Sequence, residues 1–328
     1  ERESETERER ERDRARENEK NTIIMAEETT VRRIALCPFH GSSTIDDGIR
    51  LLRDLTPTEK INLTLHFMNR DGFRFSETVE LRQLILEKNS YIHRLEVVDG
   101  FEFIVQFLLA NNGATTHFRY TNRRNEKIPI QLDQAIELSN AIRSNNNNNG
   151  NIESFLFSVC FDSGEVFQPV LDALLATGVR DLKLFLEISE NNKKGKNGGD
   201  DLDFSNISTN TSLKELKVHI YFDLGNLFDS IKGNQTIEKL TVNSRYGDGN
   251  LDNKENRAFR EMLLKNTTLI HVELTDVHYN PILWEEINIH TTLNQFWKRL
   301  IKVKRKERIA AATAAAAAVR TTTTTNVA

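Results

Sequence analysis

A pattern of three apolar positions that recurs along most of the chain constrains the fold more than any other feature of the sequence. The pattern places apolar residues at a position called p, at p+3 and at p+5, as in Leu213, Leu216 and Val218, and 27 of the 30 such positions in ten copies are apolar or aromatic. Side chains alternate between the two faces of a strand, so p+3 and p+5 point into the same core. Each copy therefore predicts one short strand with one buried face. The copies start at residues 31, 62, 92, 115, 152, 179, 213, 237, 269 and 293.

Segments with the apolar spacing of an amphipathic helix lie between most of these copies. A helix, a strand and their connections take about 30 residues, and the copies follow one another at spacings of 23 to 37 residues. Parallel strands need a crossover of this kind between them. The sequence therefore predicts an α/β array in which helices alternate with short parallel strands. The predicted helices span residues 44–55, 77–88, 101–110, 132–142, 166–176, 222–231 and 257–265.

An asparagine recurs three residues before p. Asn is the commonest residue other than Gly in the left-handed backbone conformation that often follows a helix, so we predict that it ends each helix in this way. Three of these residues also begin an Asn-x-Ser/Thr sequence, but the charged N-terminal segment lacks the apolar region of a secretory signal, and we favour the capping role over glycosylation. The asparagines are Asn89, Asn112, Asn149, Asn210, Asn234 and Asn266.

The copies at 213, 237 and 269, each an Asn, two polar residues and then the apolar positions, resemble the leucine-rich repeat proteins of the ribonuclease-inhibitor-like type. The resemblance covers roughly residues 31–297 and implies a horseshoe-shaped α/β solenoid of about nine to ten irregular repeats. That family usually places Asn or Cys at p+8, where the side chain satisfies backbone groups after the strand. Here Cys160 occupies p+8 in one copy and other residue types stand there elsewhere, so we predict that this side-chain ladder is missing.

The composition of both ends differs from that of the repeats. Residues 1–28 are rich in Glu and Arg without an apolar face, which predicts a disordered tail before a repeat domain over 29–292. The weak copy at 293 would bury Lys298 at p+5 if it formed a final strand, whereas apolar residues recur at helical spacing within 293–309. We therefore predict a capping helix there whose Phe296 and Trp297 pack on the copy at 269. Residues 310–328 form an Ala/Thr-rich tail of low complexity.

Motifs of catalysis and cofactor binding are missing from the sequence. No two of the eight His residues stand four apart with a Glu between them, and there is no phosphate-binding loop, no nucleophile elbow and no Cys pair at zinc spacing. Two cysteines are too few for a disulfide framework, which favours a reducing compartment. We therefore predict a soluble, monomeric, non-catalytic protein of the cytoplasm or nucleus that needs no cofactor, no metal and no membrane.

The strand face opposite the helices is the surface that solenoids commonly offer to partners. In the register above, p+2, p+4, p+6 and p+7 lie outside the core. We predict a protein or peptide partner for this face, while an ordinary solvated strand face remains the alternative. The candidate contact residues are His66, Arg94, Glu96, His117, Arg119, Leu156, Lys183, Phe185, Glu215, Lys217, His219, Lys239, His271 and Glu273.

A basic segment near the C-terminus is the second candidate site. The net charge of −4 argues against a surface that is basic throughout, so nucleic-acid binding or nuclear targeting would act through this segment alone. Cations at a helix C-terminus are also stabilised by the helix dipole, which requires no ligand. The segment contains Lys298, Arg299, Lys302, Lys304, Arg305, Lys306 and Arg308.

Overall fold

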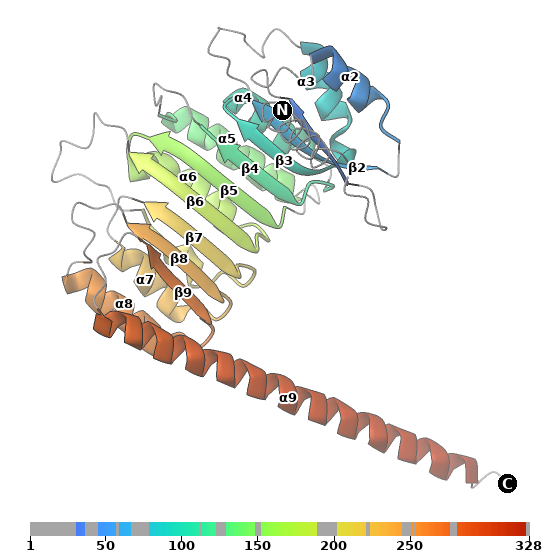
Figure 1. Ribbon diagram of the computed structural model, residues 1–328, viewed down its shortest axis with the longest axis vertical. Coiled ribbons are helices and arrows are strands. Elements are labelled where there is room, and N and C mark those ends of the chain that lie inside the picture. The colour runs from blue at the N-terminus through green and yellow to red at the C-terminus, as the bar shows by residue number, and fades with distance from the viewer. Residues whose placement is uncertain are drawn as a thin grey trace, which may run out of the picture. The chain divides into compact units, whose positions relative to one another are not determined.

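Helices and short parallel strands alternate along the chain in the computed structural model (Figure 1). The chain divides into two compact units, Glu1–Arg124 with Ser144–Ile152 and Asn125–Arg143 with Glu153–Ala328. The structure describes residues 31–36, 45–56, 59–66, 79–111, 113–122, 129–147, 152–188, 202–220, 224–244, 251, 253–275 and 281–325.

The first unit contains four strands in chain order, and each pairs in parallel with the next. A helix precedes β2, β3 and β4 in turn, as the repeat pattern predicts, and one turn of 3-10 helix follows α3. The elements are β1 (Val31–Leu36), α2 (Ile45–Arg53), β2 (Lys60–His66), α3 (Val79–Glu87), η3 (Asn89–Tyr91), β3 (Ile92–Val98), α4 (Phe101–Ala110) and β4 (His117–Thr121).

The second unit contains five strands, again parallel and in chain order. The helices α6, α7 and α8 cover one face of these strands and leave the other face open (Figure 1). The division between the units falls within α5. The elements are α5 (Leu132–Asn147), β5 (Ser154–Phe161), α6 (Gly164–Leu175), β6 (Asp181–Ile188), η4 (Ser205–Ile207), β7 (Glu215–Ile220), α7 (Gly225–Gly233), β8 (Lys239–Ser244), α8 (Asn253–Lys265), β9 (His271–Thr275) and α9 (Pro281–Thr325).

The core of the second unit is built from the recurring apolar positions. Leu216 of β7 lies opposite Leu240 of β8, and Leu240 lies opposite Val272 of β9, so that the p+3 residues form one buried row. The p+5 residues form a second buried row beside it. Phe228 of α7 and Phe259 of α8 close the core from the helix side, with ring centroids 5.0 Å apart. The predicted division into core-facing and outward-facing positions is confirmed here.

The register predicted for the copy at residue 62 is wrong. Leu63 and Leu65 lie opposite Leu95 and Val97, so they occupy p+3 and p+5, two residues earlier than predicted. Apolar residues alternate along all of β2 and therefore fit two registers, and the pairing of β2 with β3 skips one residue near its start. His66 consequently lies beyond the p+4 row to which it was assigned.

The conformation predicted for the asparagines at p−3 is also wrong. Among the described residues other than Gly, Asp99 has a positive φ and no asparagine has one. Asn234, which follows α7, has φ −74° and ψ 134°, an extended conformation. Asn112 and Asn149 lie outside the described residues.

These asparagines instead form a hydrogen-bonded ladder along the second unit. The Asn234 Nδ2 donates to the carbonyl oxygens of Ile207 (2.7 Å) and Asn210 (2.9 Å), and its Oδ1 accepts from the backbone N–H groups of Thr236 and Ile237, both at 2.8 Å. Asn266 repeats the arrangement in the next repeat. A side-chain ladder is therefore present, at p−3 rather than at the p+8 position where the resemblance placed it.

The Asn-x-Ser/Thr sequences are explained by the same ladder. The hydroxyl two residues after each asparagine donates to a carbonyl oxygen of the preceding repeat, from Ser212 to Thr177 (3.3 Å), from Thr236 to Asn210 (3.0 Å) and from Thr268 to Ile237 (2.8 Å). The side chains that would mark a glycosylation site therefore have structural roles. Asn234 and Asn266 are buried, which supports the preference for a structural role over glycosylation.

Candidate protein-binding face

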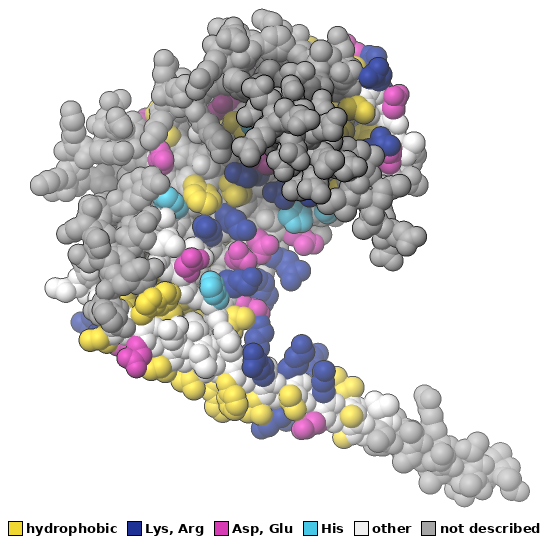
Figure 2. All heavy atoms as spheres, viewed as in Figure 1, with side chains coloured by type: hydrophobic (Ala, Val, Ile, Leu, Met, Phe, Trp, Pro, Cys, Tyr) yellow, Lys and Arg dark blue, Asp and Glu magenta, His cyan; other side chains and the backbone are white. Residues whose placement is uncertain are grey.

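The open face of the second unit presents three rows of outward-pointing side chains, set by the register of the strands. Glu215 lies opposite Lys239, Lys183 lies opposite Lys217, and Phe185 lies opposite His219. We call these six residues the central cluster. Five of them are half-buried and Lys239 is exposed, so their side chains are held by their neighbours while their outer atoms remain accessible. Figure 2 shows Lys, Arg, Asp, Glu and His side chains intermixed on this face.

Glu215 is the electrostatic centre of the cluster. Its carboxylate lies 3.6 Å from the Lys183 Nζ on β6 and 3.4 Å from the Lys239 Nζ on β8. One carboxylate thus forms ion pairs with two lysines, one on each neighbouring strand. Ion pairs at this degree of exposure contribute about 0–1 kcal/mol each to stability, so a partner's carboxylate can displace Glu215 from either lysine at little cost.

An aromatic side chain lies beside these charges. The ring centroids of Phe185 and His219 are 5.7 Å apart, and the Lys217 Nζ lies 5.8 Å from the Phe185 centroid, within the range of a cation–π contact. On β9, Glu273 accepts a hydrogen bond from Thr241 at 3.3 Å. The predicted residue Leu156 extends the row of Lys183 onto β5.

The first unit carries a smaller cluster on β3 and β4. Arg119 and Glu96 form an ion pair at 3.4 Å, and the Arg119 Nε is buried without a hydrogen-bond partner in the described structure. The Thr116 Oγ1 lies 3.2 Å from the Nδ1 of His93 and 2.8 Å from that of His117. A hydroxyl group can donate to one ring and accept from the other, so it links the two imidazoles.

The structure therefore groups most of the residues predicted for the strand face. Six form the central cluster, and Glu96, His117 and Arg119 belong to the cluster of the first unit. Arg94 is exposed on β3, and His271 is exposed opposite Lys239. Sequence analysis missed His93 and Thr116 because both stand at p+1, just where the strand begins. The available signal was the recurrence of a polar residue at p+1 in two consecutive copies, His93 in one and Thr116 in the next, with His117 beside it.

The basic segment lies on α9. Lys298 forms an ion pair with Glu238 and is thereby held against the repeats. The remaining six basic residues are exposed, and none forms an ion pair with another residue of the described structure. These residues are Arg299, Lys302, Lys304, Arg305, Lys306 and Arg308.

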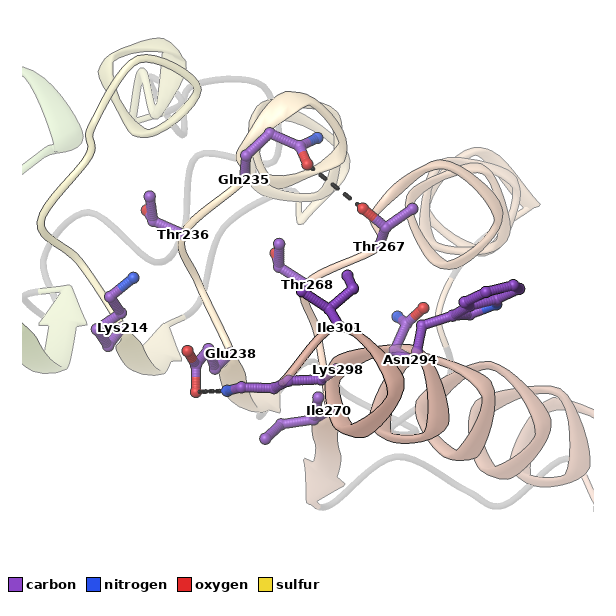
Figure 3. Close-up of a pocket in the computed structure, with 11 residues that line it drawn as sticks. Lys214, Gln235, Thr236, Glu238, Thr267, Thr268, Ile270, Asn294, Lys298 and Ile301 are labelled. Atoms are coloured by element: carbon purple, nitrogen blue, oxygen red, sulfur yellow. Dashed lines mark hydrogen bonds and ion pairs between the residues drawn. The ribbon is translucent and has the colours of Figure 1, made fainter. Parts of the chain in front are cut away.

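A groove of about 470 Å³ lies between α9 and the turns that precede β7, β8 and β9. Figure 3 shows that Lys298 reaches across it to Glu238, and that Gln235 and Thr267 contact each other at its rim, at 3.4 Å. Ile270 and Ile301 supply apolar surface to its wall. Sequence analysis missed this groove because it exists only through the position of α9.

The described residues include no group of three or more His, Cys, Asp or Glu side chains arranged to hold a metal ion. Within the same part of the chain, no helix has the length and apolar character needed to cross a membrane.

The alternation of helices with parallel strands, together with the buried rows at p+3 and p+5, defines the fold. Each unit is a leucine-rich-repeat solenoid of the α/β type. A scan against protein-family models finds no match, and a search of curated proteins finds none either.

Three solved structures with this kind of fold are similar to the chain at low identity. Leiomodin-1 actin-binding site 2 is 12% identical with a TM-score of 0.38, covering 64% of this chain and 98% of that one. The leucine-rich repeat-containing protein LegL7 from Legionella pneumophila is 13% identical with a TM-score of 0.30, covering 79% and 98%. The tropomodulin C-terminal domain from Caenorhabditis elegans is 12% identical with a TM-score of 0.26, covering 80% and 99%.

Proposed function

We propose that the chain is a non-catalytic interaction scaffold that binds a protein or peptide on its strand face. The observation that carries this proposal is the central cluster, in which Lys183 and Lys239 share the Glu215 carboxylate and Lys217 lies over the Phe185 ring. Aromatic residues, Phe among them, are enriched in protein interfaces relative to the rest of the surface. The strands hold these side chains in place before binding, which lowers the entropic cost of association.

The chemistry of the cluster favours a partner that presents an acidic group next to an apolar one. Lys183 and Lys239 can exchange Glu215 for the partner's carboxylate, and Phe185 gives the apolar group a flat surface. Lys217 lies near enough to the ring to contact both groups of the partner. An extended peptide that runs parallel to the strands would meet each of the three rows in turn.

Reversing the charge of Lys183 and Lys217 together should weaken partner binding by about tenfold or more, because the variant repels the acidic group that the native face attracts. Partners are first identified by proximity labelling in the native cell, and their affinity for the purified chain is then measured by titration. Lys265→Glu is the matched control, since Lys265 is exposed on α8, on the helix side of the repeats. A folded double variant that binds every identified partner as tightly as the native chain would refute the proposed face.

A further inference from the structure

An apolar stripe runs along the exposed side of α9, away from the strand face. Five apolar residues follow one another at alternating intervals of four and three residues. Four of them are at least 50% exposed, and Leu300 is half-buried. We call this stripe the α9 seam. Its residues are Ile289, Leu293, Phe296, Leu300 and Val303.

The repeats contact α9 on another side of the helix. Leu283, Ile287 and Thr291 are buried, and Asn294 donates hydrogen bonds to backbone oxygens of the last repeat. At about 100° of rotation per residue, these positions lie on the side of the helix roughly opposite the α9 seam. The seam is therefore not used to attach α9 to the second unit. Hydrophobic side chains are visible along α9 in Figure 2.

The spacing of the α9 seam is that of a coiled-coil interface. Alternating intervals of four and three residues average 3.5, the period that keeps one side of a helix against a partner helix. With Leu293 and Leu300 at a positions, Phe296 and Val303 occupy d positions over two heptads. A helix that merely covered a globular core would need a wider apolar face with a period of 3.6.

The positions that flank the seam are basic. In this heptad frame Arg299 and Lys306 occupy g positions and Lys304 occupies an e position, the places where charges select the partner helix. None of the three forms an ion pair with another described residue. A second copy in parallel would set Arg299 against Lys304 and add repulsion. A helix with Asp or Glu at its own e and g positions would instead neutralise all three cations.

We propose that the α9 seam binds an acidic amphipathic helix of a partner protein by coiled-coil packing. Trp297 and Ile301, both more than half exposed, extend the apolar contact from the seam toward the groove that they line. Two heptads alone give a short interface, so this added surface contributes to affinity. Because the α9 seam and the strand face share no residue, a variant that loses binding at one surface should keep binding at the other.

The test uses a synthetic peptide of three heptads with Leu at a and d and Glu at e and g, and a matched peptide with Lys at e and g. The sequence has two tryptophans, so the full chain with Trp284→Phe leaves Trp297 as the only tryptophan reporter. We expect the Glu peptide to bind about tenfold or more tightly than the Lys peptide, with a blue shift of the emission and an affinity that falls as salt is added.

A double variant, Leu293→Ser with Phe296→Ser, should abolish this binding, and Leu264→Ser, an exposed apolar residue of α8, should leave it unchanged. Both keep the native circular dichroism because the substituted side chains are exposed. Equal binding of the two peptides, or binding that survives the double variant, would overturn the proposal. So would seam-dependent self-association in sedimentation, or a blue shift with anionic phosphatidylserine vesicles or duplex DNA and none with the Glu peptide. Self-association would identify a second copy as the occupant of the α9 seam. A blue shift with vesicles would identify a lipid surface as the occupant, and one with DNA a nucleic acid.

Discussion

Replacing Asn234 by Ala should lower the free energy of unfolding of the second unit by about 2–4 kcal/mol. The side chain is fully buried and makes hydrogen bonds with two backbone oxygens and two backbone N–H groups. Ala removes all of these bonds and leaves buried backbone groups without partners, at a cost of about 1–3 kcal/mol for each group that stays unsatisfied. Water can reach some of these groups after the substitution, which keeps the total below the simple sum.

Urea unfolding followed by circular dichroism measures this change. Asn226→Ala is the control, because Asn226 is exposed on α7, and it should change the stability by less than about 0.5 kcal/mol. Asn234→Asp keeps the two acceptor interactions but sets a buried carboxylate oxygen against two carbonyl oxygens, so a loss at least as large as that of Asn234→Ala is expected. Equal stability of Asn234→Ala and Asn226→Ala would show that the ladder contributes nothing to folding.

Replacing Leu283 and Ile287 together by Ala should destabilise the last repeat by about 4–8 kcal/mol, the cost of two buried large-to-small substitutions. Both residues are buried where α9 contacts the end of the second unit, with exposed fractions of 6% and 2%. Loss of this contact exposes the apolar edge that a terminal repeat must cover. Amide hydrogen exchange should show faster exchange in β9 and α8.

The comparison variant is Phe296→Ala with Trp297→Ala. The sequence predicts that these two aromatic residues form the cap, but they are 58% and 56% exposed and contact each other, with ring centroids 5.9 Å apart. We therefore expect little change in the exchange of β9. Loss of protection in this variant, with native protection in the Leu283/Ile287 variant, would reverse the assignment of the cap.

Most of the fold follows from local patterns in the sequence. The three apolar positions of each copy specify a strand and its buried face without knowledge of its neighbours, and helical spacing located α4 at its observed bounds. The register of β2 could not be predicted in this way, because its apolar residues alternate over the whole strand. The asparagine pattern marked the correct position, but a recurring residue type does not reveal whether its backbone conformation or its side chain is the reason for it.

The candidate site was predictable as a face and not as a set of contacts. Strand alternation placed Lys183, Glu215 and Lys239 outside the core, whereas the sharing of one carboxylate between two lysines depends on the pairing of β6, β7 and β8. The side of α9 that contacts the repeats could likewise not be predicted from the sequence. Its sequence has apolar residues both on the α9 seam and at Leu283 and Ile287, and spacing alone does not decide which of the two sides contacts the repeats.

Asn294 gives the array a means of ending that does not depend on its length. Its Nδ2 donates to the carbonyl oxygen of Asn266 (3.1 Å), the acceptor that the asparagine of a further repeat would use, and also to that of Leu269 (2.8 Å), so a residue of α9 continues the ladder through one of its hydrogen bonds. The terminal helix thus accepts the ladder of a preceding repeat that carries Asn at p−3. An additional repeat built on the sequence of residues 234–265 and inserted ahead of α9 should be accepted and closed by the same helix, which makes the number of repeats an adjustable property of this scaffold.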